Sequence, residues 1–388
     1  MSKFKNIVLF AAGGGNDIFS TLAYVKAQLP QHNYQKIAII GVLGITPFHS
    51  NTPIIPNYVN VESPLIIPAS DLNRYLPLHP PKKIYNSERL LPELIKESFP
   101  EVNNYVCMSS KYSAPEQANN LRKLFSEWEM EPQTTLLNIV DFGGDILTNG
   151  NQSTLISPEL DAFTLAVVQN LKEYQRKISI CFPGVDGELQ KDYLGKVCQN
   201  SSKELININE WHESLNKVYD KIKDSRKGNT IPNMLEILKK INDPVHKLDC
   251  NVSLHWSING KVIQFQQDLD IDMELQRYVH HFDDITYNPF VTVFNSPDYD
   301  LLKVVQHTDK IYQNQLTSED SVQTADAFLQ YLRKDLDSKW TNKHILYDES
   351  NNKTQDVMLV DILPYVVPKE KRAEIKILPT FNLLYSEL

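Results

Sequence analysis

The sequence lacks several features that would place a protein quickly in a functional class. It has only four cysteines in 388 residues, and no two of them form a Cys-x-x-Cys pair. This spacing excludes the usual disulfide framework and the usual thiolate zinc site, and it indicates a reducing compartment. No apolar run approaches the roughly 20 residues that a membrane-spanning helix needs. We therefore expect a soluble protein located in the cytoplasm, with no membrane partner.

Excess positive charge is also absent. The formal net charge is −9, which disfavours a general nucleic-acid surface, because such surfaces are basic. The one basic run, from Lys221 to Lys227, is typical of a solvated helix face. Lys3 and Lys5 precede a short apolar run, as in a signal peptide, but that run ends in glycines and Asn-Asp instead of a cleavage site. We interpret it as a buried strand and expect a small-molecule ligand; the oligomeric state stays open.

Three common catalytic motifs are missing as well. There is no Gly-x-Ser-x-Gly elbow, which removes support for the usual serine hydrolase. The glycines at 13–15 are not followed by the Lys-Ser/Thr of a Walker A loop, and Ile18 occupies the third glycine position of a G-x-G-x-x-G fingerprint counted from Gly13. An ordinary hydride-transferring dehydrogenase is therefore disfavoured.

What the sequence does contain is a series of strand and helix units. Hydrophobic residues make up 41% of the chain, which is enough for a sizeable core. Continuous apolar runs of this kind predict the strands of a parallel sheet that is buried on both faces. Strands are expected at 6–12, 36–43, 105–108, 135–142 and 177–182, with helices between them and a mainly helical segment at 203–245.

The pattern changes at about residue 249. Two alternating runs around Asn259-Gly260 predict a hairpin. We therefore divide the chain into an α/β domain at 1–248, which holds the site, and a smaller α+β extension at 249–388 that packs on it. The excursion from Thr46 to about Pro81 is either a functional loop or a poorly structured insertion, and its His49 is an acid–base candidate.

Three glycine turns that carry carboxylates are the most specific signal. Each follows an apolar strand and precedes a helix, and the carboxyl ends of parallel strands share one edge of a sheet. We expect the three turns to line one cleft. Their candidate ligand contacts are Gly13, Gly14, Gly15, Asn16, Asp17, Asp141, Gly143, Gly144, Gly184 and Gly187. The catalytic candidates are Asp145, Asp161, Asp186 and Glu188, and a metal, if one is present, is expected on Asp145 and Asp186.

Carboxylates beside glycines suit a ribose hydroxyl, a Mg²⁺ ion with phosphate, or general acid–base chemistry. Asp17 at a helix N-terminus would repel a phosphate placed directly there, so a hydroxyl, an amine or a bridging cation is expected to meet it. The alternative is that the turns are only tight connections and that Asp17 and Asp161 complement helix dipoles.

The segment His280-His281-Phe282-Asp283-Asp284 has side chains that can bind metals. Adjacent residues do not face each other on a helix or a strand. We therefore interpret this segment as a surface turn in preference to a metal site.

Four blocks resemble the signature of a known family. They are Ala11 to Asp17, Asp141 to Leu147, Ser157 to Ala162 and Pro183 to Leu189. Their order and spacing are similar to those of the domain-of-unknown-function 1152 family over about residues 5–200, and more weakly to about 335. Asn16 stands where that family has a fourth glycine, and Val185 where it has a small residue or cysteine. The resemblance implies a Rossmann-like three-layer α/β sandwich with a mainly parallel sheet, and it supplies no reaction.

These observations favour an enzyme that acts on a nucleotide-like or phosphorylated ligand. It would be a hydrolase or transferase that uses a carboxylate-held water or Mg²⁺, and an NAD or ADP-ribose ligand is a variant of this hypothesis. The cofactors left open are therefore Mg²⁺ and an NAD-type nucleotide. One alternative is a non-catalytic nucleotide-binding or sensor module whose 249–388 part reads out occupancy. Another is a purely structural protein.

Overall fold

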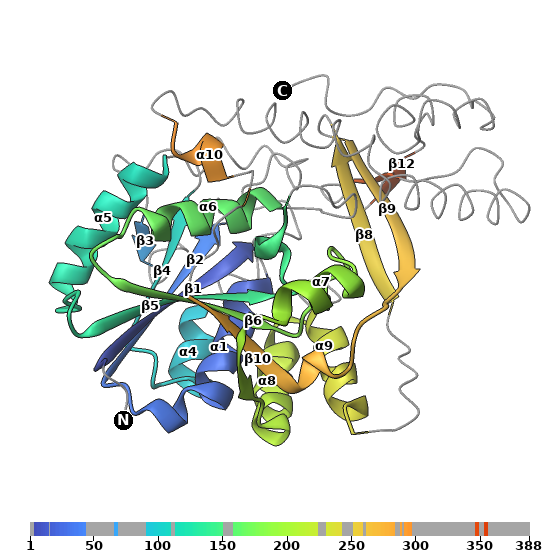
Figure 1. Ribbon diagram of the computed structural model, residues 1–388, viewed down its shortest axis with the longest axis horizontal. Helices are drawn as coiled ribbons and strands as arrows, with labels where there is room; N and C mark the ends of the chain where they lie inside the picture. Colours follow the sequence, from blue (N-terminus) through green and yellow to red (C-terminus); the bar gives the residue numbers. More distant parts are fainter. Residues whose placement is uncertain are drawn as a thin grey trace, which may run out of the picture.

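The computed structural model describes thirteen stretches of the chain. They are residues 4–14, 16–43, 66–68, 91–109, 113–149, 158–223, 230–242, 251–258, 261–283, 288, 291–296, 346–348 and 353–355. The fold over these residues is mixed α/β (Figure 1). His49 and most of the excursion from Thr46 to Pro81 lie outside the described residues, as does Gly15.

An eight-stranded sheet is the centre of the fold, with the strand order β3-β4-β2-β1-β5-β6-β10-β7. The five strands from β4 to β6 run parallel, while β3 and β10 run antiparallel to their neighbours. The predicted mainly parallel sheet is thus confirmed. The strands are β1 (Asn6–Gly14), β2 (Lys36–Leu43), β3 (Ile66–Pro68), β4 (Asn104–Ser109), β5 (Thr135–Phe142), β6 (Gln175–Cys181), β7 (Ser202–Leu205) and β10 (Tyr278–Phe282).

Helices cover both faces of this sheet (Figure 1). One hydrophobic cluster contains side chains of α1 (Asn16–Gln28), α4 (Leu91–Ser98), α8 (Ile208–Ile222) and α9 (Thr230–Lys240). The other contains side chains of α5 (Ala114–Glu127), α6 (Pro158–Gln169), α7 (Lys191–Cys198) and α10 (Val291–Phe294). This double cover explains why β1 and β5 are continuous apolar runs without polar alternation, since both of their faces are buried.

A side-chain contact caps the start of helix α5. Helix α5 begins directly after Ser113, whose backbone N–H donates to the Glu116 side chain at 3.0 Å. This is one half of a capping box, and it satisfies a donor that the helix itself leaves open. Three short 3₁₀ helices complete the described helical segments: η1 (Pro30–His32), η4 (Asp145–Leu147) and η5 (Leu275–Arg277).

The order of the strands reverses between β1 and β5. From β1 the chain passes through α1 to β2 on one side, and from β5 it passes through α6 to β6 on the other. The two helices lie on opposite faces of the sheet. The carboxyl ends of β1 and β5 therefore diverge at this point, which is where open α/β sheets bind their ligands.

The described part of the segment 203–245 is mainly helical, as predicted, but strand β7 forms at its start and pairs with β10. The expectation for the histidine segment is wrong. The histidines expected in a surface turn, His280 and His281, lie in β10 between β6 and β7, and they are 0% and 7% exposed. Both strands are short and rich in polar residues, so they lack the apolar run that identifies a buried strand.

The part of the chain after residue 248 contributes to the main sheet through β10. The predicted hairpin is present as the antiparallel pair β8 (Asn251–Ile258) and β9 (Lys261–Asp268). A second antiparallel pair joins β11 (Leu346–Asp348) to β12 (Lys353–Gln355). The division of the chain at 248 stays a prediction. No helix in the described ranges combines the length and the apolar character needed to cross a membrane.

Candidate functional site

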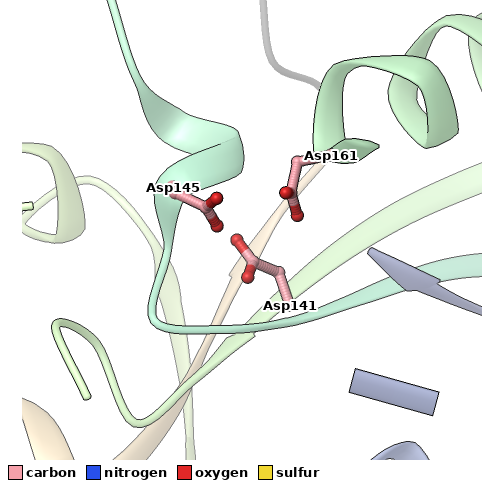
Figure 2. A group of neighbouring side chains, drawn as sticks. All are labelled: Asp141, Asp145 and Asp161. Atoms are coloured by element: carbon pink, nitrogen blue, oxygen red, sulfur yellow. The ribbon is translucent and has the colours of Figure 1, made fainter. Parts of the chain in front are cut away.

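Three buried carboxylates meet at the point where the strand order reverses. Asp141 lies at the end of β5, Asp145 begins η4, and Asp161 is in the first turn of α6. Their exposed fractions are 1%, 5% and 2%. One oxygen of each lies within 4.8 Å of the others, and Figure 2 shows the three carboxylates directed toward one another.

A second group of carboxylates adjoins the first. One oxygen each of Asp145, Asp186 and Glu188 also lie within 4.8 Å of one another. Asp186 and Glu188 belong to the turn that follows β6. Asp145 is therefore common to both groups, and we call the five residues together the carboxylate cluster: Asp141, Asp145, Asp161, Asp186 and Glu188.

Backbone groups hold the cluster in place. The Asp141 carboxylate accepts hydrogen bonds from the backbone N–H groups of Gly144 at 3.4 Å and Ile146 at 3.3 Å, which fixes η4 and with it Asp145. Asp186 Oδ1 accepts from the Glu188 N–H at 3.1 Å. The backbone N–H of Gly184 donates to the carbonyl of Gly143 at 2.5 Å. The second and third turns are thus bonded to each other directly.

At two positions in the turns a side chain larger than that of glycine would collide with a neighbouring carboxylate. A Cβ atom on Gly13 would lie 2.4 Å from Asp17 Oδ2 and 3.2 Å from Asp161 Oδ1. A Cβ atom on Gly143 would lie 1.8 Å from Asp186 Oδ2. Their φ angles are +79° and +127°, which side chains rarely adopt. The first turn therefore lies against Asp17 and Asp161, and the second lies against Asp186.

The electrostatics of the cluster are unfavourable for ionised carboxylates. Burial raises the pKa values of Asp141, Asp145 and Asp161 well above their usual range, and neighbouring carboxylates raise them further. Burial also raises the pKa of Asp186 to about 6. The neighbouring charges that act most strongly on the first three residues are carboxylates, including Asp17.

One carboxylate oxygen of the cluster makes no hydrogen bond within the described part of the chain. Asp161 shares a hydrogen bond with Asp145, yet its Oδ1 atom is buried and has no hydrogen-bond partner among the described residues. Buried charges in proteins are normally paired with an opposite charge or coordinate a metal. The arrangement is therefore suited to a cation with oxygen ligands, or to protons shared between the carboxylates.

The structure brings the four catalytic candidates together, and it places Asp141 and Asp17 beside them. Gly13, Gly143, Gly144, Gly184 and Gly187 all have positive φ angles in the turns around the cluster. Gly14 ends β1 and Asn16 begins α1, so the first turn also lies at this edge of the sheet. The roles of all these residues in binding and catalysis stay predictions.

A buried polar network surrounds the side chain of Ser179 on β6, and the sequence analysis did not predict it. His281 Nε2 donates to the Glu204 carboxylate at 2.9 Å, because an ionised carboxylate can only accept. His281 Nδ1 therefore accepts from Ser179 Oγ, also at 2.9 Å. The Asn138 amide then donates to Ser179 Oγ at 2.8 Å, and its oxygen accepts from the Tyr24 hydroxyl at 3.3 Å.

This network has the order of a serine–histidine–acid triad, but it cannot act as one. Ser179 is 0% exposed in the middle of the sheet, so no substrate can reach its hydroxyl. The network is structural, and it joins α1, β5, β6, β7 and β10. No short motif connects residues so far apart in the chain, and therefore the sequence carried no signal for it.

We expect this network to make the protein sensitive to mild acid. Burial lowers the pKa of His281, and the charge of Lys177 lowers it further, against the opposing effect of Glu204. As the pH falls, His281 therefore takes up a proton in the unfolded chain before it does so in the folded protein. The free energy of unfolding is at its full value above the usual histidine pKa of about 6.5, and it decreases as the pH falls through that value. Burial likewise lowers the pKa of His280, with the same sign.

Burial by itself would raise the pKa of Glu204, but hydrogen bonds from His281, His32 and Gln28 lower it below the usual range. The stability that the ionised Glu204 carboxylate contributes is therefore lost only when the pH falls below the ordinary glutamate pKa of about 4.3.

The test is urea unfolding of His281→Gln between pH 5 and pH 7.5. This variant is expected to lose about 1–3 kcal/mol at pH 7.5, because buried partners are left unpaired, and to show a flatter pH dependence than the wild type. His212→Gln is the matched control, since His212 lies partly exposed on α8 outside the network. An unchanged pH slope in His281→Gln would contradict the assignment.

Comparisons with known proteins bear on the same region. Residues 78–225 match the family described as "Protein of unknown function (DUF1152)", which confirms the resemblance drawn from the sequence blocks. Three of the four blocks lie inside the matched stretch, and so do all five residues of the carboxylate cluster. No match was found among curated proteins or solved structures. The comparisons thus show a match to this family over residues 78–225 and supply no reaction.

Proposed function

We propose that the carboxylate cluster binds a divalent cation of the Mg²⁺ class. The protein would use it to hydrolyse, or to transfer a group from, a phosphorylated or nucleotide-like small molecule. The observation that carries this proposal is the buried Oδ1 of Asp161, which lies among other carboxylates and has no hydrogen-bond partner in the described part of the chain. Oxygen ligands from carboxylates are those that Mg²⁺ takes in proteins.

The cation explains how an acidic site can accept a phosphate. A phosphate beside Asp17 and the cluster would be repelled, whereas a cation between them attracts both. The glycines at 13 and 143 let the backbone of the first two turns lie directly against the carboxylates of Asp17, Asp161 and Asp186, because no side chain projects from them. A nucleotide-like ligand therefore fits the edge between β1 and β5 with its phosphates toward the cation.

The topology supports the same ligand class. The five parallel strands lie in the order β4-β2-β1-β5-β6. When these five are renumbered in chain order, the arrangement is 3-2-1-4-5, which is the strand order of dinucleotide-binding sheets. We infer from this order that the fold is Rossmann-like. In such sheets the ligand lies at the reversal of strand order, which here is the position of the cluster.

Thermal unfolding with added Mg²⁺, Mn²⁺ or Ca²⁺ tests the proposal. A cation at a hundred times its Kd is expected to stabilise the wild type by about 2.7 kcal/mol, because it binds only the folded state. Asp145→Asn is expected to lose most of this response, since Asp145 belongs to both carboxylate groups. Asp192→Asn is the matched control, because Asp192 is an exposed aspartate on α7. No shift with any cation would overturn the proposal.

A second measurement separates an enzyme from a sensor. With the cation present, nucleotides, NAD derivatives and simple phosphate esters are incubated with the protein, and product release is followed. Release that disappears in Asp145→Asn supports the hydrolase or transferase. Thermal stabilisation by one of these molecules without any product favours the non-catalytic binding module. Equal turnover by Asp145→Asn would remove this residue from the catalytic set.

A further inference from the structure

We infer that three buried amide side chains position the second and third turns, and with them the carboxylates of Asp145 and Asp186. The three residues are Asn233, Gln276 and Asn288, which are 5%, 1% and 6% exposed, and we call them the amide clamp. The contacts of the amide clamp with the turns stand on their own, whereas its effect on cation binding rests on the proposed function.

The third turn is held through its backbone carbonyls. Gln276 Nε2 donates to the carbonyl of Pro183 at 2.9 Å. Asn233 Nδ2 donates to the carbonyl of Val185 at 3.2 Å. The carbonyl of Val185 and the N–H of Asp186 belong to the same planar peptide unit. Asn233 therefore fixes the orientation of the peptide unit that leads into Asp186.

The second turn is held in the same way. The backbone N–H of Ile146 donates to Asp141 Oδ2 at 3.3 Å, and the carbonyl of Ile146 accepts from Asn288 Nδ2 at 3.1 Å. The peptide units on both sides of Ile146 are therefore fixed. One of them includes the carbonyl of Asp145, so these two bonds restrict the direction in which the Asp145 side chain leaves the backbone.

Gln276 is a costly residue if stability is its only role. Its amide nitrogen donates to the carbonyls of Pro183 and Asp272, which fixes the orientation of the amide. Its Oε1 atom is then buried and has no hydrogen-bond partner within the described part of the chain. A buried acceptor without a partner costs free energy, and a methionine of similar shape would avoid that cost. Gln276 is thus better explained by the turn that its nitrogen holds.

The amide clamp holds the turns without adding charge. Asparagine and glutamine amides are neutral donors, whereas a lysine or an arginine at these positions would place a positive charge beside the carboxylate cluster. Such a charge would repel a bound cation. Neutral donors therefore fix the geometry of the carboxylate cluster and leave its charge to the cation.

The amide clamp lies outside residues 78–225, the stretch that the family model matches. Gln276 and Asn288 also follow residue 248, where we expected the domain that holds the site to end. Gln276 lies in η5, which is itself anchored to β10, because the carbonyl of Leu275 accepts from His280 Nε2 at 3.0 Å. The part of the chain after residue 248 therefore contributes to the support of the site.

Hydrogen–deuterium exchange of the full-length protein, followed by mass spectrometry, tests how the turns are held. Gln276→Met and Asn288→Leu each remove the amide and keep the approximate size of the side chain. We expect each variant to raise the exchange rate of its own turn by about threefold to tenfold, because the loss of one hydrogen bond shifts a local opening equilibrium by about this factor. The rates are read at residues 184–188 for Gln276→Met and at residues 144–148 for Asn288→Leu.

The affinity for Mn²⁺ shows whether the held geometry matters to the site. It is obtained from the electron paramagnetic resonance signal of free Mn²⁺, which bound Mn²⁺ loses. Both variants are expected to bind Mn²⁺ about threefold to tenfold more weakly than the wild type. Gln28→Met is the matched control, because Gln28 is also a buried amide (1% exposed) and ends α1, the helix that begins beside the carboxylate cluster. This control is expected to be less stable in urea but to keep wild-type exchange in both turns and wild-type affinity for Mn²⁺.

The outcomes separate the amide clamp from the proposed function. Unchanged exchange in both turns overturns the amide clamp. Faster exchange with wild-type affinity for Mn²⁺ overturns its role at the site, and so does an equal loss of affinity in Gln28→Met. If the wild type binds no Mn²⁺, the proposed function fails, and the exchange rates alone decide whether the amide clamp positions the turns. Circular dichroism checks that the variants are folded, and because Gln276→Met and Asn288→Leu act on different turns, either one alone remains decisive.

Discussion

Replacing Trp211 by alanine is expected to lower the free energy of unfolding by about 3–5 kcal/mol and to abolish the stabilising response to cations. Trp211 on α8 is 0% exposed. Its ring meets those of Phe142 and Phe182 edge-on, with centroids 6.2 Å and 5.2 Å away. These two phenylalanines come directly before the second and third glycine turns, so one indole ring packs against the residues that position both turns.

The loss has two parts. Removing the ring leaves a cavity that the surrounding helices and strands fill only partly. It also removes the Nε1–H that donates to Gln28 Oε1 at 3.2 Å, which leaves a buried acceptor unpaired. The Gln28 amide nitrogen in turn donates to Glu204 at 2.6 Å. The substitution therefore also weakens the polar network that contains Glu204, His281 and Ser179.

Urea unfolding followed by circular dichroism, with and without Mn²⁺, measures both effects. Trp128→Ala is the matched control, because Trp128 is a half-buried tryptophan at the end of α5, where it packs on Phe125 in the other hydrophobic cluster. This control is expected to lose clearly less stability and to keep the full response to Mn²⁺. A Trp211→Ala protein that still responds to Mn²⁺ like the wild type would show that the turns hold their geometry without the ring.

The sequence predicted the parallel strands well because they are buried on both faces. In β5, seven of the eight residues are buried, and no polar alternation competes with the apolar run. The three glycine turns were identified for a related reason, since each stands directly at the end of such a run. Their convergence required only the rule that parallel strands end at one edge.

The polar strands could not be predicted, because their stability comes from partners far away in the chain. His281 in β10 contacts Ser179 at a separation of 102 residues, and it contacts Glu204 at a separation of 77. A buried histidine that is fully bonded looks, in the sequence, like a histidine in a surface turn. Periodicity detects apolar burial and carries no information on polar groups that satisfy each other.

The role of Asp161 shows a second limit. In the sequence it stands in the first turn of a helix, where an acidic residue complements the helix dipole. Only the three-dimensional arrangement shows that this turn ends against Gly13 and directs Asp161 Oδ1 into the cluster. Likewise, nothing in the sequence divides the carboxylates into two groups with Asp145 in common.

Gly143→Ala is expected to damage the site and the fold together. At φ +127° an alanine is strained, which costs about 1–3 kcal/mol. Its Cβ would lie 1.8 Å from Asp186 Oδ2, and displacing that carboxylate adds about 1–3 kcal/mol for overpacking. Because Asp186 then leaves the carboxylate cluster, the protein is also expected to be stabilised less by Mn²⁺ than the wild type.

Gly195→Ala is the matched control for Gly143→Ala. Gly195 lies within α7, and a Cβ atom there would have nothing within 4 Å. Alanine is the better helix former, so this variant is expected to gain about 0.5–1 kcal/mol and to keep the full stabilising response to Mn²⁺. The two glycine variants thus make the same chemical change with opposite expected signs.

A double variant separates the two causes of the loss at Gly143. In Asp186→Ala the carboxylate that Gly143 accommodates is gone, so adding Gly143→Ala is expected to cost only the backbone strain. The difference between the two backgrounds, obtained from urea unfolding, gives the energy of the contact between the new Cβ and Asp186. An equal cost in both backgrounds would mean that Asp186 does not lie against Gly143.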